Sequence, residues 1–330
     1  MMLISRTPMR VSLFGGGTDY PDYFSKHRGA VIGLAIDKYI YIAALKLSGI
    51  QNYHYRIAYS QVEHVDCVDD IQHKAVRAAF DHYGILRPMD MSVMADMPAS
   101  SGLGSSSTFS VGLLNLLAQL REERVTKLDL ALRAIHLERD LLNENVGVQD
   151  QLHAAFGGIN RFDFDGKHYR ITPMAMRGEC LDHLMRSLLL VHTGVTRHAS
   201  KVVASQLERT RSGEIDNQLS SMLHLVDEAT EILTSLQPTA MLQRLGRLLH
   251  DSWMVKRSLS PHVSSTDIDE LYDAAMRYGA LGGKLCGAGG GGFLLMLVPP
   301  DIRENFVQAI APARVISIGL DTQGSTIIYS

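Results

Sequence analysis

A loop rich in glycine and hydroxyl groups is the part of this sequence best suited to chemistry. It spans residues 98–108, reads PASSGLGSSST, and leads directly into the apolar run FSVGLLNLLAQL, which has helical spacing. The first N–H groups of a helix lack partners within the helix and carry a partial positive charge, and glycines before them let a ligand approach the backbone. The loop therefore predicts an anion site, most simply for phosphate. The alternative is that serine and glycine only cap the helix.

A second glycine cluster, residues 282–293, reads GGKLCGAGGGGF. It contains a formal GxGxxG at Gly287, Gly289 and Gly292. A dinucleotide-binding loop follows a strand and opens a helix, whereas this cluster follows a predicted helix and opens the predicted strand FLLMLV. We therefore reject a dinucleotide site and expect these glycines to pack closely against a ligand or against other backbone.

A third run of glycines, in the segment FGGGTDY at residues 14–20, precedes Asp19 near the start of the chain. An aspartate after glycines is most often a turn former.

The elements that must position these residues change in character along the chain. The first part is rich in β-branched and aromatic runs, which predict strands. Apolar periodicity predicts helices in both halves. The predicted strands are 11–14, 30–47, 55–60, 89–97, 186–194, 291–298, 313–321 and 325–330, with strand and turn over 157–186; the predicted helices are 70–83, 126–143, 218–235, 240–258 and 266–278. The pattern predicts an α+β protein of two lobes, 1–185 and 186–330.

Composition excludes several classes of protein. The net charge of −3 argues against a general nucleic-acid binder, which needs a basic face. Cys67, Cys180 and Cys286 lie far apart without a CxxC pair, which predicts reduced thiols. The N-terminal segment lacks the apolar stretch of a signal peptide, and the longest apolar runs are too short to span a bilayer. We therefore expect a cytoplasmic protein with no nucleic-acid or membrane partner.

The three glycine segments together resemble the motifs of the GHMP kinases, which include galactokinase, homoserine kinase, mevalonate kinase and phosphomevalonate kinase. They occur in the family's order as TPMRVSLFGGGTDY, PASSGLGSSST and KLCGAGGGGF, and the resemblance covers essentially the whole chain. It implies a two-lobed fold with a mixed sheet in the N-terminal domain and a ferredoxin-like C-terminal domain. It also implies phosphoryl transfer from ATP with Mg²⁺.

The resemblance implies roles for individual residues. Asp150, in GVQDQ, matches the aspartate that faces the sugar hydroxyl, and Arg10 matches a basic residue that points at it. Glu138, in HLERD twelve residues before Asp150, matches a magnesium ligand, with Ser106 or its neighbour Ser105 completing the shell. The alternatives are that Glu138 is a solvated helix residue and that Asp150 caps the helix that follows it. The residues that match the ATP-binding loop are Pro98, Ser101, Gly102, Leu103, Gly104, Ser105, Ser106, Ser107 and Thr108.

On the acceptor side, this chain departs from galactokinases. They carry Glu-His where this sequence has Gly16 and Gly17, which opens space and disfavours galactose. A phosphorylated acceptor needs a second anion site, for which we favour Arg197 over the cluster that contains Arg28. The residues expected to bind the acceptor are Gly16, Gly17, Thr18, Asp19, Tyr20, Arg28, Thr193, Arg197, Gly287, Ala288, Gly289 and Gly290.

The GGGTD form and the segment TGVTRHAS resemble the branch of these kinases that acts on heptose 7-phosphate, with fucose kinases as relatives. The implied reaction phosphorylates the anomeric hydroxyl of D-glycero-α-D-manno-heptose 7-phosphate to the 1,7-bisphosphate, for GDP-heptose and surface polysaccharide synthesis. The alternatives are a kinase for another sugar, such as fucose, and a sensor that binds sugar and nucleotide without turnover. The partners are then a sugar phosphate and ATP, and a homodimer is compatible with the resemblance.

Overall fold

The first lobe is built on one eight-stranded sheet in the computed structural model, which describes residues 2–195, 199–235 and 237–330. Its strands are β1 (Met2–Phe14), β2 (Gly29–Lys46), β3 (Tyr55–Ala58), β4 (Val62–Val65), β5 (Met89–Ala95), β6 (Ile159–Asp165), β7 (His168–Pro173) and β12 (Thr326–Tyr329). The main order is β12-β1-β2-β5-β3-β4, and β6 pairs with both β2 and β7. Strands β3 and β5 run parallel, whereas the other paired strands are antiparallel, so the sheet is mixed.

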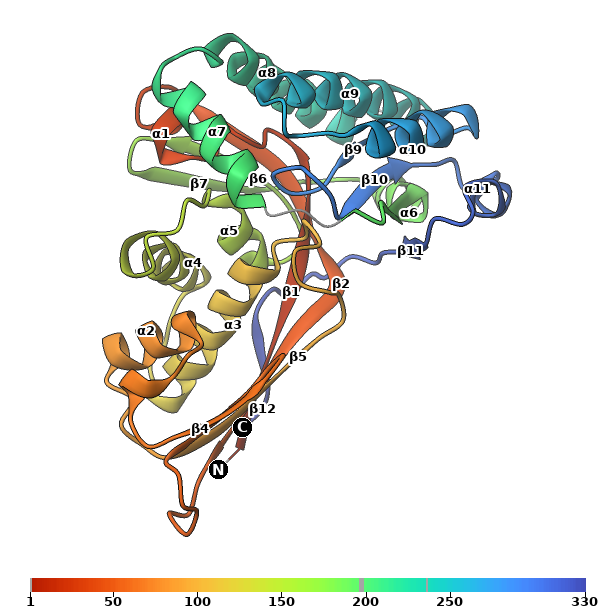
Figure 1. The fold of residues 1–330 in the computed structure, drawn as a ribbon. Coiled ribbons are helices and arrows are strands. Elements are labelled where there is room, and N and C mark those ends of the chain that lie inside the picture. Colours follow the sequence, from red (N-terminus) through yellow and green to blue (C-terminus); the bar gives the residue numbers. More distant parts are fainter. Residues whose placement is uncertain (1, 196–198, 236) are drawn as a thin grey trace.

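Helices α2 to α5 cover one face of this sheet (Figure 1). Alternate residues of β2, such as Ile40 and Ile42, point toward these helices and are buried. Helix α3 packs on β1 and β2 and also contacts α4 and α5, which explains why its sequence is apolar on almost every side. The helices and turns of this lobe are α1 (Pro21–Phe24), η1 (Val68–Asp70), α2 (Lys74–Tyr83), α3 (Ser105–Leu120), α4 (Lys127–His136), the π turn η2 (Leu137–Leu141) and α5 (Gln149–Phe156).

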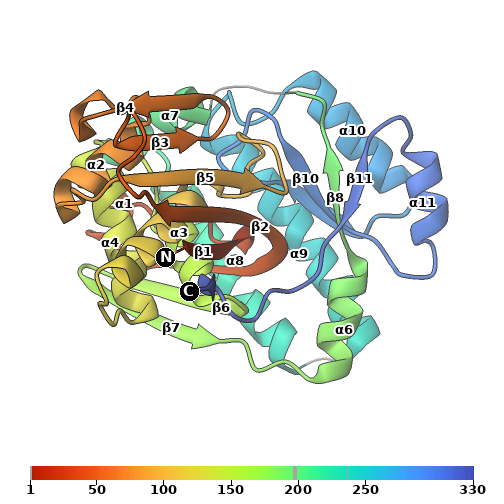
Figure 2. The same cartoon turned by 90° about the horizontal axis from the view of Figure 1, so that it is seen from below.

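The second lobe contains a four-stranded antiparallel sheet in the order β11-β8-β10-β9 (Figure 2). This strand order is that of a ferredoxin-like domain, as predicted. Helix α8 packs on β1 and β2 while its neighbour α9 packs on β9, so the pair joins the two lobes. The elements are α6 (Gly178–Ser187), β8 (Leu188–His192), α7 (Ala199–Arg211), α8 (Asp216–Ser235), α9 (Pro238–Leu259), α10 (Thr266–Arg277), β9 (Gly282–Leu285), β10 (Phe293–Leu297), α11 (Arg303–Ala309) and β11 (Val315–Ser317).

Several predicted helices and strands differ from the observed ones, mostly at their ends. The helix predicted at 70–83 begins at Lys74, and Gly84 caps it with a left-handed backbone. Thr126 caps α4, as predicted, but the regular α-helix ends at His136. The strand and turn predicted over 157–186 is wrong in its second half, which forms α6. Its buried residues Cys180 and Leu184 lie one helical turn apart.

The ends of the chain return to the same sheet. Strand β12 pairs with β1, and the two termini lie close together in Figure 1. The predicted boundary at residue 185 falls inside α6.

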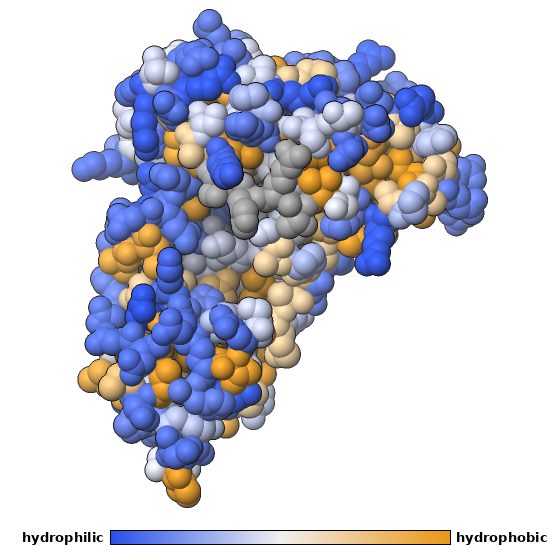
Figure 3. Space-filling view, viewed as in Figure 1, coloured by the Kyte–Doolittle hydropathy of each residue, from blue (hydrophilic) through white to orange (hydrophobic). Residues whose placement is uncertain are grey.

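Within the described ranges, no helix has both the length and the apolar character needed to cross a membrane. Hydrophilic residues cover most of the face in Figure 3, and the hydrophobic residues in view form separate groups.

Candidate active site

Residues of all three glycine-rich segments line one cavity of about 310 Å³. The first lobe contributes the ends of β1 and α3 and the start of α5, and the second lobe contributes α7, α9 and the loop after β9. The cavity therefore lies where the lobes meet. The members of the three segments in its wall are Arg10, Ser12, Gly16, Gly17, Asp19, Tyr20, Ser100, Gly102, Gly104, Ser105, Ser106, Lys284, Gly287 and Ala288.

The second and third segments approach each other through their backbones. A Cβ atom at Gly102 would lie 2.7 Å from the carbonyl oxygen of Cys286, and one at Gly287 would lie 2.7 Å from the Cα of Gly102. A side chain at either position would force the two loops apart. Gly102 and Gly287 thus allow the two loops to pack closely, and both also line the cavity.

The N-terminus of α3 faces the cavity. The helix begins at Ser105, directly after Gly104, and Gly104 makes no side-chain capping bond. The serines after it are not capping residues either, because Ser107 and Ser110 donate to Glu138. This arrangement favours the anion site over the alternative of a simple helix cap.

Arg10 connects the catalytic candidate Asp150 with the loop at residues 98–108, which we call the phosphate loop after its proposed role. Its Nε and Nη2 atoms donate to the two carboxylate oxygens of Asp150 at 2.7 and 2.6 Å, and its Nη1 donates to the carbonyl of Gly102 at 2.6 Å. Burial opposes the charge of Arg10, but the Asp150 carboxylate outweighs it and raises the pKa of the guanidinium. Asp150 is the second residue of α5, where the helix dipole favours a negative charge. It therefore has a structural role at a helix start as well as a place in the cavity.

Glu138 is completely buried on the π turn η2, so the alternative of a solvated helix residue is wrong. Its carboxylate accepts hydrogen bonds from Ser107 and Ser110, each at 2.9 Å, and from the side-chain amide of Gln151. Burial raises the pKa of Glu138 to about 7, although these three donors oppose the shift. The turn thus holds a carboxylate directly beneath the first turn of α3.

Glu138 and Ser106 offer oxygen donors of the kind that a magnesium ion prefers. The hydroxyl of Ser106 lies 3.4 Å from Glu138 Oε1 and also lines the cavity. Mg²⁺ prefers oxygen ligands and usually takes only one or two from protein carboxylates, with phosphates and water completing its shell. Over the described ranges, no group of three or more His, Cys, Asp or Glu residues could hold a metal. A site shared with nucleotide phosphates suits this donor set.

Asp19 also lines the cavity and is buried. Its carboxylate accepts from the N–H of Gly17 at 2.9 Å and from the amide nitrogen of Gln149 at 3.0 Å. Burial raises its pKa. Thr18 does not line the cavity; its hydroxyl donates to backbone carbonyls and holds the turn.

Two family models match the chain. The model of the GHMP kinases N terminal domain matches residues 70–158, and the model of the GHMP kinases C terminal domain matches residues 239–316, together just over half of the sequence. The chain belongs to the GHMP kinase family. It is thus a phosphotransferase with an alcohol group as acceptor.

Individual relatives extend over nearly the whole of this GHMP kinase. The D-glycero-alpha-D-manno-heptose 7-phosphate kinase of Campylobacter jejuni is 27% identical over 93% of this chain and 92% of that protein. A galactokinase of Pyrococcus furiosus is 25% identical over 92% of this chain and 91% of that protein.

Solved structures share its fold. A D-glycero-D-manno-heptose 1-phosphate kinase from Bacteroides thetaiotaomicron has a TM-score of 0.80 at 21% identity, covering 99% of this chain and 100% of that chain. A Lactococcus lactis galactokinase in complex with galactose has a TM-score of 0.75 at 19% identity, covering 98% of this chain and 95% of that chain.

Some residues expected in the site of this GHMP kinase lie beside the cavity rather than in its wall. Within the loop at 98–108, Ser101, Leu103 and Thr108 are buried away from the cavity, whereas Pro98 at its start is exposed. Arg28 is half exposed and pairs with Asp227 at 2.7 Å. Thr193 donates to the carbonyl of Gly292. Gly289 packs on Val263, and the N–H of Gly290 donates to the carbonyl of Val263. Arg197 lies outside the described residues.

Two lysines line the cavity that were not among the residues predicted from the sequence. Lys256 of α9 donates to the carbonyls of Leu285 and Gly287, and Lys284 of β9 donates to that of Leu13. No ion pair with a carboxylate is found for either ammonium in the part of the chain that the structure describes. Burial lowers the pKa of both, and that of Lys284 to about 8. Lys284 stands inside a glycine motif, but no sequence pattern singles out Lys256.

A second cavity, of about 530 Å³, continues from the phosphate loop. Ser105 and Ser106 line both cavities. The second one is bordered by the rings of Tyr59, His73 and Phe109, with His73 4.7 Å from Tyr59 and 4.8 Å from Phe109 between ring centroids. Its aromatic and polar wall has the size and character of a site for a flat base. No motif in the sequence marks it.

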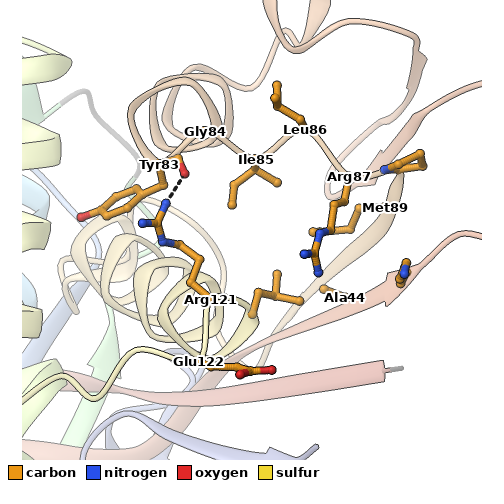
Figure 4. Close-up of a pocket in the computed structure, with 12 residues that line it drawn as sticks. Ala44, Tyr83, Gly84, Ile85, Leu86, Arg87, Met89, Arg121 and Glu122 are labelled. Atoms are coloured by element: carbon orange, nitrogen blue, oxygen red, sulfur yellow. Dashed lines mark hydrogen bonds between the residues drawn. The ribbon is translucent and has the colours of Figure 1, made fainter.

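A further hollow, of about 480 Å³, lies far from Asp150, between the ends of α2 and α3 (Figure 4). Aliphatic side chains such as Ile85 and Met89 line it. Arg121 at its edge is already engaged, because it donates to the carbonyl of Tyr83 and to Glu123. This hollow holds no paired acid and base and is not the reaction site.

Proposed function

We propose that this GHMP kinase transfers the γ-phosphoryl group of ATP to the anomeric hydroxyl of D-glycero-α-D-manno-heptose 7-phosphate and forms the 1,7-bisphosphate. The observation that carries the proposal is the position of Arg10. One guanidinium holds both oxygens of Asp150 and the carbonyl of Gly102 in the phosphate loop. An acid–base group and a phosphate site are thereby joined through a single side chain.

The nucleotide would bind along α3. Its base would occupy the cavity beside Tyr59 and His73, and its β- and γ-phosphates would meet the N–H groups at the start of α3. Glu138 and Ser106 would hold Mg²⁺, which neutralises charge on the phosphate oxygens when bound. Phosphoryl transfer requires mainly such positioning and charge neutralisation.

The acceptor would bind between Asp19 and Asp150. The anomeric oxygen attacks the γ-phosphorus, its proton passes to a carboxylate oxygen of Asp150, and the bond to ADP breaks. Arg10 keeps Asp150 in one orientation and brings positive charge close to the transferred group. Among the described residues that line the cavity, Asp150 is the carboxylate with an exposed edge, since 23% of its side chain is accessible.

Two features support an acceptor that carries its own phosphate. Gly16 leaves room in the cavity, and the buried amines of Lys256 and Lys284 have no carboxylate partner in the described part of the chain. Burial lowers the pKa of both amines, and a phosphate bound beside them would favour their charged forms. The relative of C. jejuni is a heptose 7-phosphate kinase by name. Arg197 remains our candidate for an additional phosphate contact. The bisphosphate would then serve synthesis of GDP-heptose and surface polysaccharide in the cytoplasm.

The test is ADP release with MgATP and a panel of acceptors. The panel contains the heptose 7-phosphate, sedoheptulose 7-phosphate, mannose 6-phosphate, fucose, galactose and a blank without sugar. We expect turnover with the heptose 7-phosphate and little with the others. Turnover with an unphosphorylated sugar alone would retain the sugar kinase and refute the phosphate requirement. Nucleotide binding without turnover on any acceptor would contradict the proposal.

A further inference from the structure

Two polar atoms in the wall of the active-site cavity have no hydrogen-bond partner in the described part of the chain. They are Oε1 of Gln149 and Oγ of Ser12. The two residues are only 9% and 8% exposed. An unpaired polar atom that is this deeply buried is unfavourable, and native proteins contain few of them. The proposed phosphoryl transfer uses neither atom.

The side chain of Gln149 is fixed by its contact with Asp19. Its amide nitrogen donates to Asp19 Oδ2 at 3.0 Å, and the backbone supports the contact because the N–H of Val148 donates to the carbonyl of Asp19 at 3.1 Å. The amide has one stable orientation, since turning it over would place its oxygen against a carboxylate. Oε1 is therefore left as a free acceptor.

Ser12 reaches the same space from β1. Gly16 lies between the two side chains: a Cβ atom at this position would be 3.8 Å from Gln149 Nε2 and 4.0 Å from Ser12 Oγ, and no other heavy atom is as near. The missing side chain thus leaves a gap bordered by an amide and a hydroxyl. Ser12 can donate or accept a hydrogen bond, whereas Gln149 Oε1 can only accept.

We propose that Gln149 and Ser12 form a subsite that binds two hydroxyl groups of the acceptor and so selects polyhydroxylated acceptors. The inference rests on the proposed function as a sugar kinase. One hydroxyl donates to Gln149 Oε1, and a second exchanges a hydrogen bond with Ser12 Oγ. An acceptor without these hydroxyls leaves both buried atoms unpaired, which discriminates more strongly than an apolar wall does. The attacking hydroxyl is a third one and faces Asp150.

Two variants and one matched control test the subsite. Ser12→Ala removes only an unpaired hydroxyl, and Gln149→Met removes the amide at nearly constant length. Ser5→Ala is the control, because Ser5 lies on the same strand, is fully buried, has an equally unpaired Oγ, and lies outside the cavity wall. Kinetic constants are measured for the panel acceptor that the wild type turns over best, for its monodeoxy analogues, and for ATP.

In Ser12→Ala and Gln149→Met, kcat/KM for the parent acceptor should fall about tenfold, mainly through KM, while KM for ATP stays unchanged. For at least one monodeoxy analogue, the wild type should have a low kcat/KM, and one of the two variants should show the same low value. Ser5→Ala should match the wild type throughout. The subsite is refuted if both cavity variants keep the wild-type KM for the acceptor, or if they weaken all analogues equally. Because the comparison uses the sugar that the wild type accepts, a failed heptose assignment is a separate result.

Discussion

The two sides of the active-site cavity treat their buried polar groups differently. On the proposed nucleotide side, the Glu138 carboxylate is fully buried and receives hydrogen bonds from Ser107, Ser110 and Gln151. The amide oxygen of Gln151 has no partner in the described ranges, but this residue lies outside the cavity wall. On the acceptor side, Gln149 Oε1 and Ser12 Oγ have no partner in the described ranges of the chain.

The protein therefore supplies the hydrogen-bond partners of Glu138 itself, whereas the partners of Gln149 Oε1 and Ser12 Oγ would come from the ligand. The nucleotide side is held in place by its own hydrogen bonds, which suits chemistry common to the GHMP kinases. The acceptor side keeps polar atoms whose partners must come from outside, which suits a specificity that differs between family members. Substitutions on the first side should therefore affect turnover with any acceptor, whereas those on the second should depend on the acceptor.

The largest effect is expected for Asp150→Asn. The amide cannot accept the proton of the hydroxyl, so kcat should fall by at least about a hundredfold, the low end for removing an acid–base group. The dissociation constant of ATP, measured by calorimetry, should stay close to that of the wild type because the proposed contacts to the phosphates come from the start of α3 rather than from Asp150. Near-normal turnover would remove Asp150 from the mechanism.

Replacing Glu138 by glutamine should weaken the response to magnesium on the nucleotide side. We expect the Mg²⁺ concentration for half-maximal activity to rise by at least about tenfold, since metal sites lose this much even when a supporting residue is changed. Asp140→Asn is the matched control, because Asp140 lies on the same π turn but is exposed and paired with His136. An unchanged magnesium titration in the Glu138 variant would place the metal elsewhere.

Replacing Gly16 or Gly17 by alanine should affect different properties, acceptor binding for Gly16 and folding stability for Gly17. Gly17 has φ +103°, and a Cβ there would lie 2.9 Å from both Gln206 Nε2 and Leu219 Cδ2, so Gly17→Ala should cost about 1–3 kcal/mol in urea unfolding. Gly16→Ala should leave stability within about 0.5 kcal/mol but raise KM for the acceptor, because the methyl group enters the gap. Equal stability losses in both variants would contradict this description of the gap.

A smaller, pH-dependent effect is expected at His153, which supports Gln149 from beneath. Its Nδ1 donates to the carbonyl of Gln149 at 2.8 Å, and burial lowers its pKa to about 4. The unfolded chain then binds more protons between pH 4 and about 6.5, so stability is complete above this range and falls as the pH falls. Between pH 6.5 and 5, wild type should lose about 2 kcal/mol more than His153→Asn in urea unfolding. Parallel losses in both proteins would exclude His153 as the cause.

The glycine-rich segments and the periodic helices could be predicted from the sequence because their signals are local. Thr126 before α4 and Gly84 after α2 are caps with a definite backbone role, and both have it in the structure. Helix α6 was missed although its four apolar residues have helical spacing, because the segment is short and follows two strands. The pairing of β12 with β1 joins residues from opposite ends of the chain, which no local pattern indicates.

The site was predictable where a motif marks it and not where long-range packing makes it. Arg10 and Asp150 stand in motifs, and the structure joins them directly. Lys256 lies on a helix without a motif, and only the packing of α9 against β9 brings it to the cavity. Gln149 stood beside Asp150 in the sequence, but its importance depends on the contact with Asp19, which is 130 positions away.

The most direct test of the account is ³¹P NMR of the product formed from MgATP and D-glycero-α-D-manno-heptose 7-phosphate. The account predicts ADP and a sugar with two phosphate resonances, one of them coupled to the anomeric proton. Asp150→Asn, run in parallel, should form this product at least about a hundredfold more slowly. A second phosphate on any other carbon, or hydrolysis of ATP without a phosphorylated sugar, would contradict the assignment of Asp150 and its cavity to anomeric phosphorylation.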